Sequence, residues 1–573
     1  MLAKVRLMLI LAVCMGLLGC TQQPEKQEMP LPKPQEGPVE ETFPNEEPLI
    51  ENREVYSQDQ PGSIVYLYVT VVKEENPELK TTTFNEINRS LTGLNAKGED
   101  LKAKVIFQEG TAEGPKVGYL GFGETRANGT LELRGESSRS SEQKSFKLRL
   151  FDSTGFWRDQ RQINLSKHRN DITRVRQKLS FDYFSQIPNM TSLRTQFVDL
   201  KIKDLTGSRP DTDFVDFGLF TQIEQPNKSF LQAHGLDRNG NLYKTVNFEF
   251  QRYPDKIKLV DDPSFNKKAF ESVLENKGND NHQKLIDMLE AVNDPAININ
   301  TVLDTYFDRE NYYAWLAANI LMGNADTAAH NFYLYSPSNS KKFYFLPWDY
   351  DLSWGFFEEE AKRVPTITLG KWEFGISNYW VSSLHRRVFK DPKNVKQLDE
   401  EIEELGHVIT KEKTNEMLKS YYPIVSKYVR QLPDLYNLPQ PVEQFDKEYA
   451  IIPNQPEINK ERYYKAKENP MPFYMDEPKK IGGAMHFTWD HSYDLQGDDL
   501  SYDFAVSYDP GFTRIVAQAK GLKGTEYTVP INGTGRFFWR VLVHDAKGNT
   551  STSFDRVEVE NSRYHGVKEF TVK

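Results

Sequence analysis

The segment 324–351 constrains the fold of this chain most strongly, because it predicts a β-hairpin that carries polar groups at one end. Two aromatic runs, Phe332–Tyr335 and Phe343–Leu346, flank a polar stretch rich in turn residues. In an antiparallel hairpin the start of the first strand lies beside the end of the second. Three carboxylates and an amide are therefore expected at one edge of the hairpin: Asp326, Asn331, Asp349 and Asp351.

Carboxylate and amide oxygens are ligands for Mg²⁺, which usually leaves some of its coordination positions open to substrate phosphates. The spacing of Asp326 and Asn331 equals that between the catalytic Asp and the metal-binding Asn of a protein-kinase loop. Asp349 then follows where a kinase places its second metal-binding Asp. Asp and Asn are also common turn residues, so the spacing alone leaves ordinary turn chemistry as an alternative.

The first residues are typical of a secretory signal. Lys4 and Arg6 precede a short apolar run at 7–18, and Leu17-Leu18-Gly19-Cys20 resembles a bacterial lipobox. We therefore expect cleavage before Cys20, a lipid on Cys20, and an extracytoplasmic lipoprotein held at the membrane by that anchor. An ordinary signal peptide with a chance cysteine is the alternative. Cys14 would leave with the signal and Cys20 would carry the lipid, so no pair of cysteines would remain for a disulfide.

Patterning divides the remainder into four parts. Residues 21–62 are rich in Pro, Glu and Gln and predict a disordered tether. Residues 63–440 have strands first and helices later, which indicates an α+β domain. After an expected linker at 441–470, short strands with turn signals at 471–573 predict a β-sandwich. The net charge of −10 and pI near 5.7, with no basic stripe, argue against a nucleic-acid partner.

Periodicity makes two helix predictions that bear on the hairpin. Apolar residues at helical spacing predict one helix over 302–322, which Gly323 should end and which leads directly into the Asp326 loop. Another helix is expected over about 171–185, with Asn170 or Asp171 as its N-cap.

Several motifs resemble those of the spore coat protein H (CotH) kinase family, in the family's order, over about residues 64–435. They are Arg134-Gly135-Glu136-Ser137-Ser138, Lys144-Ser145-Phe146-Lys147-Leu148, Gly218-Leu219-Phe220-x-x-x-Glu224, Asn241-Leu242-Tyr243-Lys244, Asp326 with Asn331, and Pro347-Trp348-Asp349-Tyr350-Asp351 with Gly355. The last motif is the most specific. Glu142 and Gln143 stand where the family usually has Pro before its Lys pair. Near the other end, Gly535–Val541 with Asp545-x-x-Gly548-Asn549 resembles a fibronectin type III module.

The resemblance implies an atypical, two-lobed protein-kinase-like fold that binds ATP with Mg²⁺ or Mn²⁺ and phosphorylates Ser or Thr of coat or envelope proteins. By position it implies Asp326 as the catalytic base and Asn331 and Asp349 as metal ligands, with Asp351 as a further residue of the metal site. His330 is expected to fill the loop rather than bind metal, because no second His or Cys has metal spacing near it.

The resemblance also implies a set of nucleotide-side residues: Arg134, Ser137, Lys144, Lys147, Glu224 and Lys244. Lys144 is the first choice for the phosphate contact and Lys147 is nearly as good. Glu224 would orient that lysine, as a Lys–Glu pair does in kinases; a solvated strand end is the alternative. The planar guanidinium of Arg134 would bind phosphate through two parallel hydrogen bonds; stabilisation of its own loop is the alternative.

A second function class fits the same sequence. A surface-anchored protein could use the kinase-like fold and the β-sandwich to hold a protein or polysaccharide partner without catalysis, since a fold alone does not fix function. The scarcity of ATP outside the cytoplasm favours this class. The presence of Asp326, Asn331 and Asp349 together favours a kinase, because the set has little purpose without a metal ion.

Overall fold

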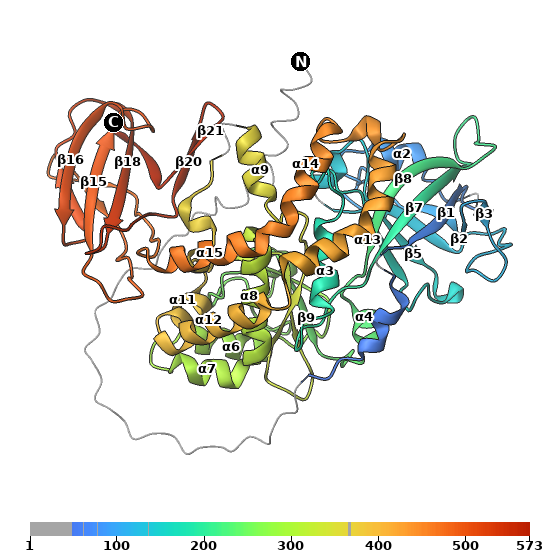
Figure 1. Ribbon diagram of the computed structural model, residues 1–573, viewed down its shortest axis with the longest axis horizontal. Helices are drawn as coiled ribbons and strands as arrows, with labels where there is room; N and C mark the ends of the chain where they lie inside the picture. The colour runs from blue at the N-terminus through green and yellow to red at the C-terminus, as the bar shows by residue number, and fades with distance from the viewer. Residues whose placement is uncertain (1–48, 61, 77, 136, 365–367, 573) are drawn as a thin grey trace.

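The computed structural model describes residues 49–572 apart from 61, 77, 136 and 365–367 (Figure 1). The predicted signal peptide, Cys20 and most of the expected tether lie outside the described residues. Where the tether was expected to continue to residue 62, the chain instead forms a 3₁₀ helix, η2 (Arg53–Gln58), with Val55 buried. None of the described helices is long and apolar enough to cross a membrane. The mixed α+β class predicted from the sequence is confirmed.

An eight-stranded sheet forms the first region, in the order β1-β7-β8-β6-β5-β4-β2-β3. Its strands are β1 (Ile64–Val72), β2 (Ala103–Thr111), β3 (Gly114–Pro115), β4 (Gly129–Leu133), β5 (Phe146–Leu150), β6 (Gln162–Ser166), β7 (Thr195–Asp204) and β8 (Val215–Ile223). An additional antiparallel pairing of β1 with β2 closes the sheet on itself. The apolar side chains that alternate along these strands fill one hydrophobic cluster. The short helix α2 (Phe84–Arg89) contributes Phe84 and Ile87 to this cluster.

Strands β7 and β8 join this sheet to the rest of the molecule because both of their faces are buried. Val198, Leu200 and Phe220 belong to the cluster of the closed sheet, whereas Phe197 and Leu219 belong to a larger cluster formed mainly by helices. Figure 1 shows α13 (Lys411–Val429) lying beside the sheet. Strands β7 and β8 therefore lie between the two hydrophobic clusters and pack against both.

The helix-rich region surrounds a small sheet ordered β10-β9-β11-β12. Its strands are β9 (Asn241–Thr245), β10 (Leu274–Asn276), β11 (Phe332–Ser336) and β12 (Tyr344–Pro347). Its helices are α3 (Arg176–Phe184), α4 (Lys228–Ala233), α5 (Lys267–Glu271), α6 (Gln283–Asn293), α7 (Ile299–Tyr306), α8 (Arg309–Met322), α9 (Phe356–Arg363), α10 (Ile376–Tyr379), α11 (Ser383–Phe389), α12 (Pro392–Gly406) and α13. Helix α8 is buried along nearly its whole length and leads into the hairpin β11–β12.

The single helix expected over 302–322 is wrong, because α7 and α8 are separate. Phe307 has extended backbone and bridges to Phe343, while the Asp308 side chain accepts the N–H of Asn311 and starts α8 as its N-cap. Gly323 does end α8, in the left-handed conformation with φ 65°.

Helix α3 also begins later than predicted. Arg174 has φ 63°, which interrupts any helix that starts at 171. The Asp171 carboxylate instead accepts the N–H groups of Thr173 and Arg176 and fixes the turn that enters the helix. The N-cap position itself is Val175, whose side chain cannot cap.

The expected linker at 441–470 is helical. It forms α14 (Glu443–Ile451) and α15 (Gln455–Lys467), and α15 packs against α8, where Asn459 Nδ2 donates to the Leu321 carbonyl at 3.1 Å. Phe445 and Tyr463 are buried in the helical core. This burial explains the correction, because the buried aromatic side chains anchor both helices to the core.

The C-terminal region is built of short strands. They are β13 (Lys479–Ile481), β14 (Ala484–Thr488), β15 (Ser501–Ser507), β16 (Ile515–Leu522), β17 (Glu526–Val529), β18 (Gly535–His544), β19 (Thr550–Thr552), β20 (Arg556–Val559), β21 (Ser562–His565) and β22 (Val567–Val572). A sheet of β13-β14-β17 and a sheet of β16-β15-β18-β19, with β22 beside β18, enclose one hydrophobic cluster. The region contacts the helices through ring pairs, Trp372 with Phe554 and Trp380 with Tyr493.

Candidate metal and nucleotide site

The hairpin predicted from the sequence is confirmed. Strands β11 and β12 pair antiparallel, with Phe332 opposite Pro347, so the residues just before β11 and just after β12 lie at the same end. Asn331 directly precedes β11 and Asp349 is the second residue after β12. Both have left-handed backbone, with φ 62° and 60°. Short polar residues adopt this conformation at modest cost.

The Asp326 carboxylate is held by its own loop. Asp326 lies in η5 (Ala325–Thr327), one Oδ atom is 2.7 Å from His330 Nε2, and the other accepts from Asn331 Nδ2 at 2.8 Å. His330 is thus a direct partner of Asp326 and not the loop filler that we expected. Burial lowers the pKa of His330, but the Asp326 carboxylate more than compensates and the pKa is raised. Both contacts fix the direction in which Asp326 points.

The two carboxylates after β12 are half-buried and lie in a negatively charged environment. Asp349 accepts from Gln177 Nε2 of α3 at 3.2 Å, and burial raises its pKa, with Arg134 opposing and Asp326 adding to the rise. Burial together with Asp349, Asp326 and Asp171 raises the pKa of Asp351 well above its usual range. Among the described residues the Asp351 carboxylate has no hydrogen-bond or ion-pair partner. Such a group favours a bound cation, because like charges that lie close together and are partly removed from water resist ionisation.

Arg134 is the nucleotide-side candidate that the structure brings to this cluster. It follows β4, and its guanidinium lies 5.5 Å from the centroid of the Trp348 ring. Burial lowers the pKa of Arg134, and Asp349 and Asp351 oppose that effect by their charge. The side chain of Ser137, in the same loop, lies outside the described residues.

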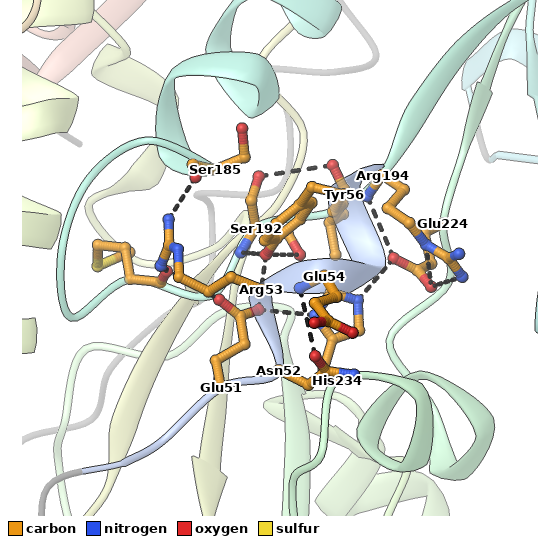
Figure 2. A network of polar contacts seen from close by, with 12 residues as sticks. Glu51, Asn52, Arg53, Glu54, Tyr56, Ser185, Ser192, Arg194, Glu224 and His234 are labelled. Carbon is orange, nitrogen blue, oxygen red and sulfur yellow. Dashed lines mark hydrogen bonds and ion pairs between the residues drawn. The ribbon is translucent and has the colours of Figure 1, made fainter. Parts of the chain in front are cut away.

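The expected pair of Lys144 with Glu224 is not formed. Lys144 Nζ donates to the carbonyls of Ser90 and Arg139, whereas Glu224 is bonded to Arg194 and His234 (Figure 2). Glu224 Oε1 accepts from Arg194 Nη2 at 2.6 Å, and Oε2 accepts the Arg194 backbone N–H at 3.1 Å. A buried carboxylate needs such partners, and they come from residues distant in sequence that no strand motif reveals.

Lys147 and Lys244 form ion pairs across neighbouring strands. Lys147 of β5 pairs with Glu132 of β4, and Lys244 of β9 pairs with Glu275 of β10 at 3.1 Å. The charge of Lys244 lowers the pKa values of Asp349 and His330, so Lys244 acts on the hairpin site. Of the two lysines weighed for the phosphate contact, Lys147 rather than Lys144 has a carboxylate partner.

Sequence reasoning missed the residues of α3 that support the site. Gln177 contacts Asp349 directly, and Arg176 is fully buried between Asp171 and Glu448, with Nη2 at 3.2 Å from the Glu448 carboxylate. The run Arg176-Gln177-Lys178 is polar and reads as a solvated helix face. Its partners come from elements distant in the sequence: Glu448 of α14 for Arg176, Asp349 for Gln177 and Thr195 of β7 for Lys178.

Comparison with known proteins identifies this class of structure, a mixed α+β domain with a carboxylate-bearing hairpin. A family model described as CotH kinase protein matches residues 131–457, more than half of the chain, and the chain belongs to this family. The chain is also 24% identical over 275 residues to the inner spore coat protein H of Bacillus subtilis (strain 168), an alignment that covers 47% of this chain and 70% of that protein. The family segment includes the hairpin site and α14.

Proposed function

We propose that this protein is an atypical Ser/Thr protein kinase that transfers the γ-phosphate of ATP to proteins of the envelope or coat. The observation that carries the proposal is the group of half-buried carboxylates at one end of the hairpin. There the charge of Asp326 raises the pKa of Asp349, and the charges of both raise the pKa of Asp351. Membership in the CotH kinase protein family supports it. Carboxylate and amide oxygens at one edge fit Mg²⁺ or Mn²⁺.

In this proposal Asn331, Asp349 and Asp351 would hold the cation, which when bound supplies positive charge to the phosphate oxygens. Asp326 orients the acceptor hydroxyl and takes its proton as the hydroxyl oxygen forms a bond to the γ-phosphorus. The bond from that phosphorus to the β–γ bridging oxygen breaks, and ADP leaves. His330 and Asn331 hold Asp326 in position. Arg134 and Lys244, whose charges act on Asp349, are the cations that would contact phosphate.

The finer features of the fold belong to the same proposal. The closed sheet β1–β8 would be the smaller lobe and the helix-rich region the larger lobe of a kinase-like structure, with the hairpin site between them. The two C-terminal sheets around one core support a β-sandwich of fibronectin type III type. Lipidation of Cys20 would hold the protein at the membrane outside the cytoplasm.

Nucleotide binding tests the proposal. We expect titration calorimetry to show ATP binding to the wild-type protein with Mg²⁺ or Mn²⁺ and none after chelation. Asp349→Ala removes a metal ligand and should abolish binding. Asp326→Asn should keep most of the affinity, because its role is with the acceptor hydroxyl. Asp213→Asn, which alters an exposed acid in the β7–β8 loop, is the matched control.

Two results would count against the site. If the wild-type protein binds no nucleotide with either metal, the non-catalytic binding protein takes the place of the kinase. If Asp349→Ala and Asp326→Asn both bind nucleotide like wild type, the nucleotide site lies elsewhere in the chain.

A further inference from the structure

A second group of acidic side chains lies in the C-terminal region, away from the hairpin. Asp494 and Asp498 come from the loop between β14 and β15, and Asp545 comes from the turn between β18 and β19. Each offers one carboxylate oxygen, and these oxygens lie within 4.8 Å of one another. Asp494 is 6% exposed and Asp545 is 7% exposed, so two of the three carboxylates are buried.

Backbone hydrogen bonds fix two of these carboxylates from one side. Asp494 Oδ1 accepts the N–H groups of Gln496 and Asp498, both at 2.9 Å. Asp545 Oδ1 accepts the N–H groups of Lys547 and Asn549 at 2.9 and 2.8 Å. These bonds are the ordinary chemistry of Asx turns, and by themselves they do not indicate a ligand.

The second oxygen of Asp494 is the feature that points to a ligand. Asp494 Oδ2 is buried and has no hydrogen-bond partner among the described residues. A buried carboxylate oxygen without a partner costs free energy. The other carboxylates of the cluster are those of Asp498 and Asp545. Lys547 contacts Asp498, and Asn549 Nδ2 donates to Asp545 Oδ2 at 2.7 Å, but neither donates to Asp494 Oδ2. A hard cation would complete this arrangement.

Lys547 supplies part of the balancing charge. Its Nζ lies 2.8 Å from Asp498 Oδ2, and hydrogen bonding to Asp498 together with the charges of Asp498, Glu468 and Asp494 raises its pKa. One ammonium faces three carboxylates, so a net negative charge remains. The Lys547 side chain is 52% exposed, which leaves it free to move into solvent when another cation arrives.

We propose that Asp494, Asp498 and Asp545 form a structural Ca²⁺ site that is separate from the hairpin site. Ca²⁺ accepts irregular sets of carboxylates from two loops at about 2.3–2.6 Å and fills its other positions with water or carbonyls, whereas Mg²⁺ demands a near-ideal octahedron. Modules outside the cell that bind Ca²⁺ typically do so with Kd values of about 0.1–1 mM, and we expect this range.

The ion would connect parts of the molecule that are otherwise joined by loops. The β14–β15 loop runs between the two C-terminal sheets, and the β18–β19 turn belongs to the second sheet. Gln496, in the same loop, donates from Nε2 to the carbonyl of Lys467 at the end of α15, at 3.0 Å. Ca²⁺ would thus stiffen both the C-terminal region and its joint with α15.

Terbium luminescence and thermal unfolding of the full chain test this site. All proteins carry Asp349→Ala, so that the hairpin does not contribute to metal binding. We expect Tb³⁺ luminescence that Ca²⁺ displaces at millimolar concentration, and a rise in melting temperature with CaCl₂ that equal MgCl₂ does not match. Asp494→Asn and Asp545→Asn should each weaken Ca²⁺ binding at least 10-fold. Asp509→Asn, an acid of another turn in the same region, should not.

The variant Lys547→Gln tests the site even if an Asp variant unfolds. Because this change removes the competing ammonium, it should increase the affinity for Ca²⁺ several-fold without loss of folding. Weaker or unchanged binding in this variant would overturn the proposal, and so would displacement of Tb³⁺ by Ca²⁺ that is the same in Asp545→Asn. Failure here leaves the kinase proposal untouched, because the two sites share no residue.

Discussion

At the scale of single residues, His234 is held between two carboxylates inside the protein (Figure 2). Its Nδ1 lies 2.7 Å from Glu51 and its Nε2 lies 2.9 Å from Glu224. Burial lowers the pKa of His234, but the two carboxylates outweigh burial and raise it to about 8. The pKa of Glu224 is about 2, because His234 and Arg194 outweigh the opposing effect of burial. The charged imidazole therefore ties the segment before β1 to the domain.

This contact predicts a pH-dependent stability. The pKa of His234 is about 8 when folded and 6.5 unfolded, so its stabilisation is complete below pH 6.5 and is lost as pH rises through 8. A shift of this size corresponds to about 2 kcal/mol. We expect urea unfolding to show that His234→Gln costs about 2 kcal/mol more at pH 6 than at pH 9. A cost that does not change with pH would contradict this account.

The part of the site that the sequence predicts is the placement of residues within one short segment, whereas their chemical roles remain predictions. Asp326, Asn331 and Asp349 belong to one hairpin, and a hairpin places its own ends together. The predicted pairing of Glu224 with Lys144 is wrong, because the partners of Glu224 are Arg194 and His234. These residues come from other elements, and only the packed structure brings them to Glu224.

At the scale of elements, α14 is connected to the hairpin site through a chain of buried ion pairs. Glu448 of α14 binds Arg176 of α3 and Arg363 of α9, and Arg176 also binds Asp171. Asp171 in turn raises the pKa of Asp351. The hydrophobic periodicity of α3 is weak because it is buried on all sides, so neither its start nor this connection could be predicted from the sequence.

Glu448→Gln tests this connection. The change keeps the shape of the side chain but leaves Arg176 and Arg363 with less compensating charge, so we expect a loss of about 2–3 kcal/mol in the free energy of unfolding. Glu443→Gln changes an exposed acid on the same helix and should cost less than about 0.5 kcal/mol. Equal small effects in urea unfolding would show that α14 packs without this polar contact.

At the scale of the whole molecule, the described regions form a continuous body from the closed sheet to the C-terminal strands (Figure 1). Trp372 and Trp380 bring the C-terminal region against the helices, at ring distances of 5.0 Å and 5.5 Å from Phe554 and Tyr493. We therefore expect the hairpin site and the C-terminal region to keep a fixed relative position, whatever tethers the chain in front of residue 49.

The proposed lipid anchor makes a prediction at this scale. Cys20→Ser should move the protein from the membrane fraction to the soluble fraction, because the described helices include no membrane-spanning segment and acyl chains contribute about 0.8 kcal/mol per buried CH₂. Cys14→Ser, within the expected signal peptide, is the matched control and should leave the protein at the membrane. A mature N-terminus other than lipidated Cys20 in mass spectrometry would contradict the anchor.

Transfer of labelled γ-phosphate from ATP tests the central claim most directly. With Mg²⁺ or Mn²⁺ the wild-type protein should label itself or a Ser/Thr-rich acceptor, and chelation should stop the reaction. Asp326→Asn should reduce the rate about 100-fold or more while it still binds nucleotide, because the variant lacks the group that takes the hydroxyl proton. Absence of transfer by the wild-type protein with either metal, or transfer by Asp326→Asn at the wild-type rate, would contradict the account.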